Sequence, residues 1–211
     1  MTEEPIQEQL EKVLSVAGFS SADAALVGKL KAYLNLLVRW NAWTNLTAVR
    51  DTAGILSRHF LESIECAGRL PAGVETLLDF GSGAGFPGIP IALCRGEIAV
   101  TLAESQGKKA AFLQEAVRTL GISAVVHSAR AETLKERFDC VTLRAVDNMP
   151  AAVRIASRLV ADGGWLALMT TDTELERLNG NVDFGPSGFT IHTLGGSEHR
   201  ILALTRKHAD Q

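Results

Sequence analysis

The stretch LLDFGSGAGFPGIPIAL, residues 77–93, constrains the fold of this chain more than any other feature. An apolar segment ends at Phe80, and four glycines follow within eight residues. A strand that turns directly into a helix while its backbone approaches a ligand needs glycine, because side chains would block both the dihedral angles and the approach. The stretch therefore predicts a strand, a tight turn and a helix, with a ligand at the carboxyl end of the strand. A tight turn that binds nothing is the alternative.

Strand and helix patterns alternate from about residue 74 onwards. This alternation favours the α/β class, a mostly parallel sheet covered by helices on both faces. The last two strand patterns flank the turn GGSE and predict a C-terminal β-hairpin, which would add an antiparallel strand. Besides a short helix after the glycine turn, we expect helices over 107–121 and 148–160 and seven strands over 75–80, 98–104, 123–128, 138–146, 165–171, 188–194 and 199–207.

The first seventy residues contain helical patterns only. A helix over 21–41, with Ser21 or Asp23 as its cap, would carry one apolar stripe formed by Leu26, Leu30, Tyr33, Leu34 and Leu37. A second amphipathic helix over 54–70 is stopped by glycine and proline. Because no low-complexity linker follows, we expect residues 1–70 to form a helical extension packed on an α/β domain over 71–211.

The composition is that of an ordinary globular protein, with 46% of the 211 residues apolar and 21% charged. The N-terminus is polar and acidic, unlike a secretory signal, and no apolar run approaches the roughly 20 residues of a membrane span. Cys66, Cys94 and Cys140 are scattered, which predicts buried thiols in a reducing compartment, the cytoplasm. The five histidines lack metal-ligand spacing, so we expect no metal.

Two glycine patterns overlap in the turn and favour different cofactors. The G-x-G-x-G pattern of Gly81, Gly83 and Gly85 is common in proteins that bind S-adenosylmethionine. The G-x-G-x-x-G pattern of Gly83, Gly85 and Gly88 is common in proteins that bind NAD or FAD. Glu104 ends the next strand, nineteen residues after Gly85, and is placed to accept hydrogen bonds from two ribose hydroxyls. Both cofactors contain a ribose, so Glu104 does not separate them.

Three features favour S-adenosylmethionine. Pro87 and Pro90 remove two N–H donors from the segment where a pyrophosphate would bind. The chain leaves no room for a separate substrate domain and has no Tyr-x-x-x-Lys pair, since its only tyrosine is Tyr33. A closing β-hairpin suits a methyltransferase sheet. Asp79 is then placed to act as a second anion facing the positively charged methionyl end, or else to stabilise the turn.

Several motifs around the glycine turn resemble one bacterial family, the small-subunit ribosomal RNA methyltransferase G or GidB family. They are LLVRWNAWTNLTAVRD, RHFLESI, LAESQGKKAAFL, RAETL, TLRAV and GGSEHRILALTRK. The glycine turn alone indicates only a methyltransferase, whereas a generic methyltransferase has no reason to carry WNxxxNLT or RHxxxS. The resemblance runs over nearly the whole chain, in order and with compatible spacing.

The resemblance implies a class I, Rossmann-like methyltransferase that uses S-adenosylmethionine and releases S-adenosylhomocysteine. Its target would be N7 of guanine 527 in the decoding-region loop of 16S rRNA, met in the small ribosomal subunit or its precursor, and we expect a monomer. From the turn and the family together we predict a cofactor site of Asp79, Gly81, Gly83, Gly85, Phe86, Glu104, Ser105, Ala131, Glu132 and Arg144. Glu104 departs from the family pattern, because many members carry Asp there.

Guanine N7 has an exposed lone pair, so its methylation needs alignment and exclusion of water rather than a strong general base. In agreement, the sequence lacks the Asn/Asp-Pro-Pro-Tyr tetrapeptide used on exocyclic amines and a Cys suited to attack a pyrimidine. Arg144 is the predicted catalytic residue, acting by position and charge on O6 of the guanine or on a neighbouring phosphate. An ion pair with Glu104 or Glu132 is the alternative for Arg144.

The net charge of −3 argues against indiscriminate RNA binding, but residues 108–144 carry three more basic than acidic side chains. Lys108 and Lys109 begin a helix, where positive charge opposes the helix dipole, and this suggests a phosphate partner. Arg58 and His59 are predicted either to reach the edge of the cleft or to form a packed structural pair.

Asn41, Asn45 and Thr47 are expected to cap the end of their helix. Two other functions stay open. One is a methyltransferase that acts on another RNA, a protein or a small molecule, which the negative net charge favours. The other is a non-catalytic ribosome assembly factor with a degenerate pocket, which the intact glycines and Glu104 disfavour.

Overall fold

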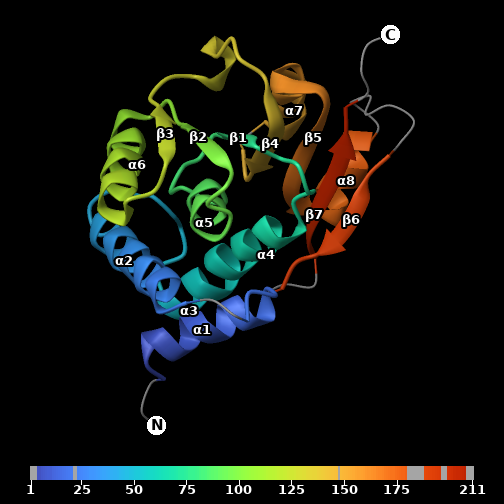
Figure 1. Ribbon diagram of the computed structural model, residues 1–211. Helices are drawn as coiled ribbons and strands as arrows, with labels where there is room; N and C mark the ends of the chain where they lie inside the picture. Colours follow the sequence, from blue (N-terminus) through green and yellow to red (C-terminus); the bar gives the residue numbers. More distant parts are fainter. Residues whose placement is uncertain (1–3, 21–22, 147, 180–187, 196–198, 208–211) are drawn as a thin grey trace.

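The computed structural model describes residues 4–20, 23–146, 148–179, 188–195 and 199–207. One seven-stranded sheet with the order β3-β2-β1-β4-β5-β7-β6 runs through the molecule, and helices lie on both of its faces (Figure 1). The strands are Thr76–Phe80 (β1), Ala99–Ala103 (β2), Ala124–His127 (β3), Phe138–Arg144 (β4), Val160–Thr171 (β5), Thr190–Thr193 (β6) and Arg200–Arg206 (β7). The predicted α/β class and its seven strands are confirmed.

Strands β1 to β5 pair in parallel, and β7 pairs antiparallel with both β5 and β6, which confirms the C-terminal hairpin. The order reverses at β1, whose neighbours are β2 and β4. In sheets of this kind, ligands bind outside the carboxyl ends of the strands where the order reverses. The glycine turn follows β1 and therefore lies at this position.

The helices have the following bounds: Ile6–Val16 (α1), Ala24–Asn41 (α2), Thr52–Gly54 (α3), Ile55–Leu61 (η1, a π-helix), Glu62–Arg69 (α4), Gly88–Cys94 (α5), Gly107–Leu120 (α6), Ala131–Thr133 (η2, a 3₁₀ helix), Met149–Leu159 (α7) and Asp172–Asn179 (α8). Asp23 caps α2, since its carboxylate accepts a hydrogen bond from the N–H of Leu26 at 2.8 Å. Helix α6 ends at Gly121, which has the left-handed φ of 56° that favours glycine.

Two apolar clusters lie on opposite faces of the sheet, because neighbouring residues of a strand point to opposite sides. On β1, Leu77 belongs to the cluster beneath α1, α2, α4, α5 and α6, and Leu78 to the cluster beneath α7 and α8. Cys140 and Val141 on β4 divide in the same way. This double coverage explains why the central strands are apolar on both faces rather than alternating.

The N-terminal helices share the first of these clusters with the sheet. Tyr33 of α2 is fully buried among Phe60, Phe86 and Phe112, and its hydroxyl donates a 2.6 Å hydrogen bond to the carbonyl of Ala84 in the glycine turn. Helix α2 therefore supports the turn directly. The domain boundary at residue 70 stays a prediction.

Several elements differ from the expectation, and helices α1, α3 and η2 lie where the sequence patterns specified no helix. Strand β5 begins at Val160 rather than at residue 165, and its ladder with β4 shifts register between Phe138 and Cys140. Helix α8 was not predicted, because the segment DTELERLN is mostly polar. The expected helix over 54–70 contains the π-helix η1 in its first half. None of the helices in the described ranges is long and apolar enough to span a membrane.

Candidate active site

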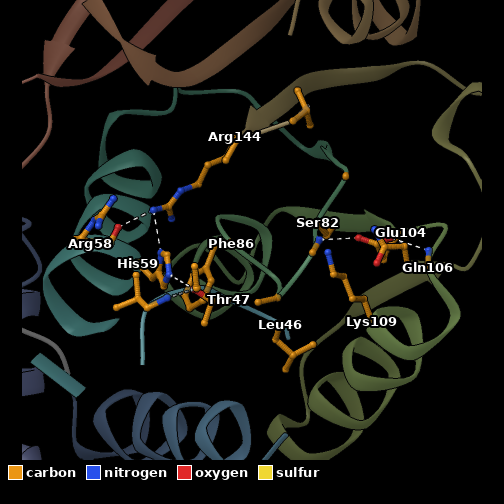
Figure 2. Close-up of a pocket in the computed structure, with 17 residues that line it drawn as sticks. Leu46, Thr47, Arg58, His59, Ser82, Phe86, Glu104, Gln106, Lys109 and Arg144 are labelled. Atoms are coloured by element: carbon orange, nitrogen blue, oxygen red, sulfur yellow. Dashed lines mark hydrogen bonds between the residues drawn. The ribbon is translucent and has the colours of Figure 1, made fainter. Parts of the chain in front are cut away.

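A cavity of about 550 Å³ opens at the carboxyl ends of β1, β2 and β4. Its walls come from the loop after α2, the π-helix, the glycine turn and the residues that follow β2 and β4 (Figure 2). The lining residues are Leu46, Thr47, Ala48, Val49, Arg58, His59, Gly81, Ser82, Gly83, Ala84, Phe86, Glu104, Gln106, Lys109, Arg144, Ala145 and Val146. Segments that are distant in the sequence thus form one ligand-sized site.

The glycine turn follows a path that side chains would prevent. Gly81, Gly83 and Gly85 have φ values of 71°, 57° and 91°. A Cβ atom on Gly85 would lie 2.4 Å from Cδ1 of Ile89, so this glycine is needed for packing. A Cβ on Gly83 would meet only the carbonyl of Gly81 at 3.8 Å, and Gly83 itself lines the cavity. Gly83 therefore gives a ligand access to the backbone, whereas Gly85 closes the turn.

Glu104 lies immediately after β2 and is held by the main chain of two segments. Its Oε2 accepts a hydrogen bond from the N–H of Gly83 at 3.0 Å, and its Oε1 accepts one from the N–H of Gln106 at 2.7 Å. The carboxylate is only 7% exposed and lines the cavity. Each oxygen keeps one acceptor position, so the oriented pair can receive two hydroxyls of a ribose.

Asp79 is fully buried beneath the turn and is not among the residues that line the cavity. Its carboxylate accepts hydrogen bonds from the hydroxyl of Thr142 at 2.9 Å and from the N–H of Gly88 at 3.1 Å. Burial raises the pKa of Asp79 to about 6, and these hydrogen bonds oppose the shift. The contacts favour the turn-stabilising role for Asp79 over the cofactor-facing one.

Arg144 ends β4 with its guanidinium held against the N-terminal helices. Nη2 donates to Oε2 of Glu62 at 2.9 Å and to the carbonyl of Arg58 at 2.6 Å, and Nη1 donates to the hydroxyl of Ser63 at 3.2 Å. The alternative prediction, an ion pair of Arg144 with Glu104 or Glu132, is wrong. The acidic partner of Arg144 is Glu62, which is fully buried. Burial lowers the pKa of Arg144 to about 10, while Glu62 opposes the shift, so the side chain stays cationic.

The residue after Arg144 also has an unusual backbone. Ala145 has a φ of 49°, the left-handed region that non-glycine residues rarely adopt, and it lines the cavity beside Val146. Strain of this kind costs about 1–3 kcal/mol and is often found at ligand sites.

His59 lies between Phe86 and Arg144 (Figure 2). Its ring stacks on that of Phe86 with centroids 5.0 Å apart, its Nδ1 lies 3.1 Å from Nη2 of Arg144, and its Nε2 lies 2.7 Å from the hydroxyl of Thr47. Burial, and after it the charges of Arg144 and Arg58, lower the pKa of His59 to about 3. His59 is therefore neutral at physiological pH. Its position agrees with both alternatives, because the ring packs against its neighbours and the residue also lines the cavity.

The loop after α2 is shaped by Asn41, which is buried. Its side-chain oxygen accepts hydrogen bonds from the N–H groups of Leu46 and Thr47, both at 3.0 Å. Asn45 accepts a hydrogen bond from Arg50 at 2.6 Å. In the described residues, the side chains of Asn41, Asn45 and Thr47 thus bond groups outside α2 rather than the carbonyls at its end, so the expected helix cap is wrong. Asn41 instead shapes the loop and positions Thr47 on the cavity wall.

The other predicted residues divide between the cavity and the surface around it. Phe86, Arg58 and Lys109 line the cavity. The lining does not include Gly85, Ser105, Lys108, Ala131 or Glu132. Lys108 is exposed, whereas Lys109 is half-buried, so the two lysines that the sequence pairs face different surroundings.

Three lining or supporting residues were missed, Gln106, Glu62 and Ser63, and Thr47 was expected only as a helix cap. A usable signal existed for Glu62 and Ser63, because they lie three and four residues after His59 in RHFLESI, the spacing of one helix face. Such a row of polar side chains on a helix that also carries an apolar stripe indicates a polar partner. That partner is Arg144.

The three cysteines are scattered over the fold. Cys66 and Cys140 are buried and Cys94 is half-buried, all as free thiols. Within the described ranges, no three His, Cys, Asp or Glu side chains gather where they could hold a metal ion.

The fold is similar to that of solved methyltransferases. An O-methyltransferase from Bacillus cereus in complex with SAH matches with a TM-score of 0.60 and 18% identity, over 94% of this chain and 100% of that one. A 16S rRNA methyltransferase from T. thermophilus in complex with AdoMet and guanosine matches with a TM-score of 0.56 and 22% identity, over 77% of this chain and 44% of that one. At these identities the likeness concerns the fold alone.

Sequence identity to other proteins is higher than to these two solved structures. "Ribosomal RNA small subunit methyltransferase G" of Xanthomonas euvesicatoria is 45% identical over 89% of this chain and 90% of its own length. The protein of the same name from Stenotrophomonas maltophilia is 43% identical over 80% and 81%. The family model described as rRNA small subunit methyltransferase G matches residues 27–184, which include the glycine turn, Glu104 and Arg144. The chain therefore belongs to the rRNA small subunit methyltransferase G family.

Proposed function

We propose that this protein transfers a methyl group from S-adenosylmethionine to N7 of guanine 527, in the decoding-region loop of 16S rRNA. Membership in the family supports small-subunit rRNA as the substrate class and methyl transfer as the reaction. The N7 position is supported by the absence of a suitable general base among the described residues that line the cavity. The ring nitrogen N7 carries no proton before attack, so no base is needed.

The ionisable side chains of the cavity are arginines, a lysine, His59 and Glu104. His59 is a very weak base, because its pKa is lowered to about 3. Glu104 already accepts hydrogen bonds from the N–H groups of Gly83 and Gln106. An enzyme that methylates an exocyclic amine must also handle a proton on that amine, and this set of side chains suits that task poorly.

The residues present fit S-adenosylmethionine as the methyl donor. When bound, it supplies a methyl group on a positively charged sulfur. Glu104 would hold the ribose hydroxyls, and Gly81 and Gly83 would let the cofactor approach the backbone of the turn. A methyltransferase of similar fold was solved in complex with SAH, which supports S-adenosylmethionine as the donor.

Arg144 would act by position and charge at the end of the cavity opposite Glu104 (Figure 2). Glu62, Ser63 and the carbonyl of Arg58 fix its guanidinium, so it needs little reorganisation when a ligand arrives. Its donors suit O6 of the guanine or a phosphate oxygen. We expect the enzyme to act as a monomer in the cytoplasm on the small ribosomal subunit or its precursor.

A methyl-transfer assay tests the proposal. Labelled S-adenosylmethionine would be incubated with the protein and three substrates: small subunits from cells that lack the modification, 16S rRNA stripped from those subunits, and fully modified subunits. We expect label in 7-methylguanine at position 527 of the unmodified material only. Label on another atom or another nucleotide would refute the N7 assignment, and label on no RNA would refute the substrate class.

A further inference from the structure

A chain of hydrogen bonds runs from Arg144 to the cavity wall. Nη2 of Arg144 lies 3.1 Å from Nδ1 of His59, and Nε2 of His59 lies 2.7 Å from Oγ1 of Thr47. The same Oγ1 lies 3.2 Å from the N–H of Val49. These contacts join the end of β4 to the loop after α2 through one imidazole ring.

The direction of each hydrogen bond follows from the chemistry of its ends. An arginine has no acceptor, so Nδ1 of His59 must be the acceptor in this contact, and it shares the two protons of Nη2 with the carbonyl of Arg58 and Oε2 of Glu62. A neutral imidazole that accepts at Nδ1 carries its proton on Nε2, and it therefore donates to Thr47. The low pKa of His59 agrees with a neutral ring. The cation at Arg144 thus fixes the tautomer of His59.

Thr47 is then left with a single way to bond a ligand. A hydroxyl has two acceptor positions and one proton. His59 and the N–H of Val49 occupy the acceptor positions, and among the described residues no hydrogen bond uses the hydroxyl proton. The side chain is half-buried on the cavity wall, and Asn41 fixes the backbone of Thr47 by a 3.0 Å hydrogen bond.

We infer that Thr47 is a hydrogen-bond donor of fixed direction, which binds an acceptor oxygen of the molecule held in this cavity. The inference rests on the proposed function. Two oxygens have the required chemistry, the carboxylate of the methionyl group of the cofactor and the carbonyl O6 of the target guanine. Arg58 and Arg144 line the same wall and also select for acceptors. An adenine would present its amino group there instead of O6, and two donors would face each other.

The experiment compares Thr47→Val, which removes the hydroxyl at nearly constant shape, with Thr47→Ser, which restores it. Thr44→Val is the matched control, because Thr44 lies in the same loop and its hydroxyl donates to the carbonyl of Trp40 at 2.6 Å rather than into the cavity. Each full-length variant would be titrated with S-adenosylhomocysteine in a calorimeter. Each would also be assayed for methyl transfer to unmodified small subunits at saturating S-adenosylmethionine.

We expect Thr47→Val to lose on the order of tenfold, either in cofactor affinity if the acceptor is the carboxylate, or in kcat/KM for the subunits if it is O6. Thr47→Ser should recover most of this loss, and Thr44→Val should show neither effect at equal fold content by circular dichroism. A Thr47→Val protein with unchanged affinity and unchanged kcat/KM would overturn the inference. A wild-type protein without transfer activity would refute the proposed function instead, and the cofactor titration alone would then decide the inference.

Discussion

At the scale of single residues, the glycines of one turn have different tasks. Gly85 has a φ of 91°, and a Cβ atom there would lie 2.4 Å from Ile89 and 3.0 Å from the hydroxyl of Tyr33. That hydroxyl donates to the turn itself, at the carbonyl of Ala84. Gly85 therefore determines how α2 packs against the turn, even though it does not line the cavity.

Gly85→Ala should lower the free energy of unfolding by roughly 3 kcal/mol, since left-handed strain and steric overlap both oppose the new methyl group. Gly107→Ala is the control, because a Cβ on Gly107 has no atom within 4 Å and the residue begins a helix. We expect the control to change stability by less than about 1 kcal/mol. Urea denaturation of both variants measures the difference, and equal stability of the two would contradict this account of Gly85.

At the scale of elements, Glu62 joins three parts of the fold. It begins α4, and its Oε2 lies 2.9 Å from Arg144 at the end of β4 and 3.4 Å from Arg200 at the start of β7. Burial raises the pKa of Glu62, while the two arginines lower it. The cost of burying these charges is offset only while the ions remain together.

Glu62→Gln should destabilise the protein by about 3–5 kcal/mol, because it leaves the buried Arg144 without its counter-ion. Glu97→Gln breaks the pair between Glu97 and Arg95, in which the Glu97 side chain is 61% exposed, and should cost less than about 1 kcal/mol. Thermal and urea unfolding would measure both. If the two substitutions lower the free energy of unfolding equally, the ion cluster of Glu62, Arg144 and Arg200 does not hold α4, β4 and β7 together.

At the scale of the whole molecule, a protein with a net charge of −3 must bind a polyanion through a local surface. The structure separates the two lysines at the start of α6, since Lys109 lines the cavity and Lys108 is exposed outside it. Reversal of both would thus disturb the cavity as well as the surface. Lys108 alone is the better probe of an RNA-binding surface.

Lys108→Glu should weaken binding to unmodified small subunits severalfold, and the effect should shrink as salt rises from 50 to 200 mM, because counterion release drives such contacts. Affinity for S-adenosylhomocysteine should stay the same. Lys12→Glu changes the net charge equally at an exposed position on α1 and should have little effect. Equal losses from both substitutions would point to the overall charge instead of a surface at α6.

The sequence pattern predicted the sheet, its closing hairpin and Glu104 of the cavity, and the family resemblance implied Arg144. Glycine spacing and apolar periodicity can be read from residues close together in the chain. They reflect local backbone sterics and the alternation of buried and exposed positions, so they predict local elements. The π-helix η1 was missed, because apolar residues at helical spacing do not distinguish a π-turn from an α-turn. Strand β5 was predicted five residues too short, since glycines at 163 and 164 resemble a turn.

What the sequence determined by itself is the order of elements and the chemistry of the glycine turn, because each depends on residues close together in the chain. The tertiary structure alone decided that Arg144 pairs with Glu62 rather than Glu104, that Asp79 is buried against Thr142 and does not line the cavity, and that His59 connects Arg144 to Thr47. These contacts join residues up to 85 positions apart. The packing of the N-terminal helices on the sheet brings Arg144 to Glu62 and His59, and the pairing of β1 with β4 brings Thr142 to Asp79.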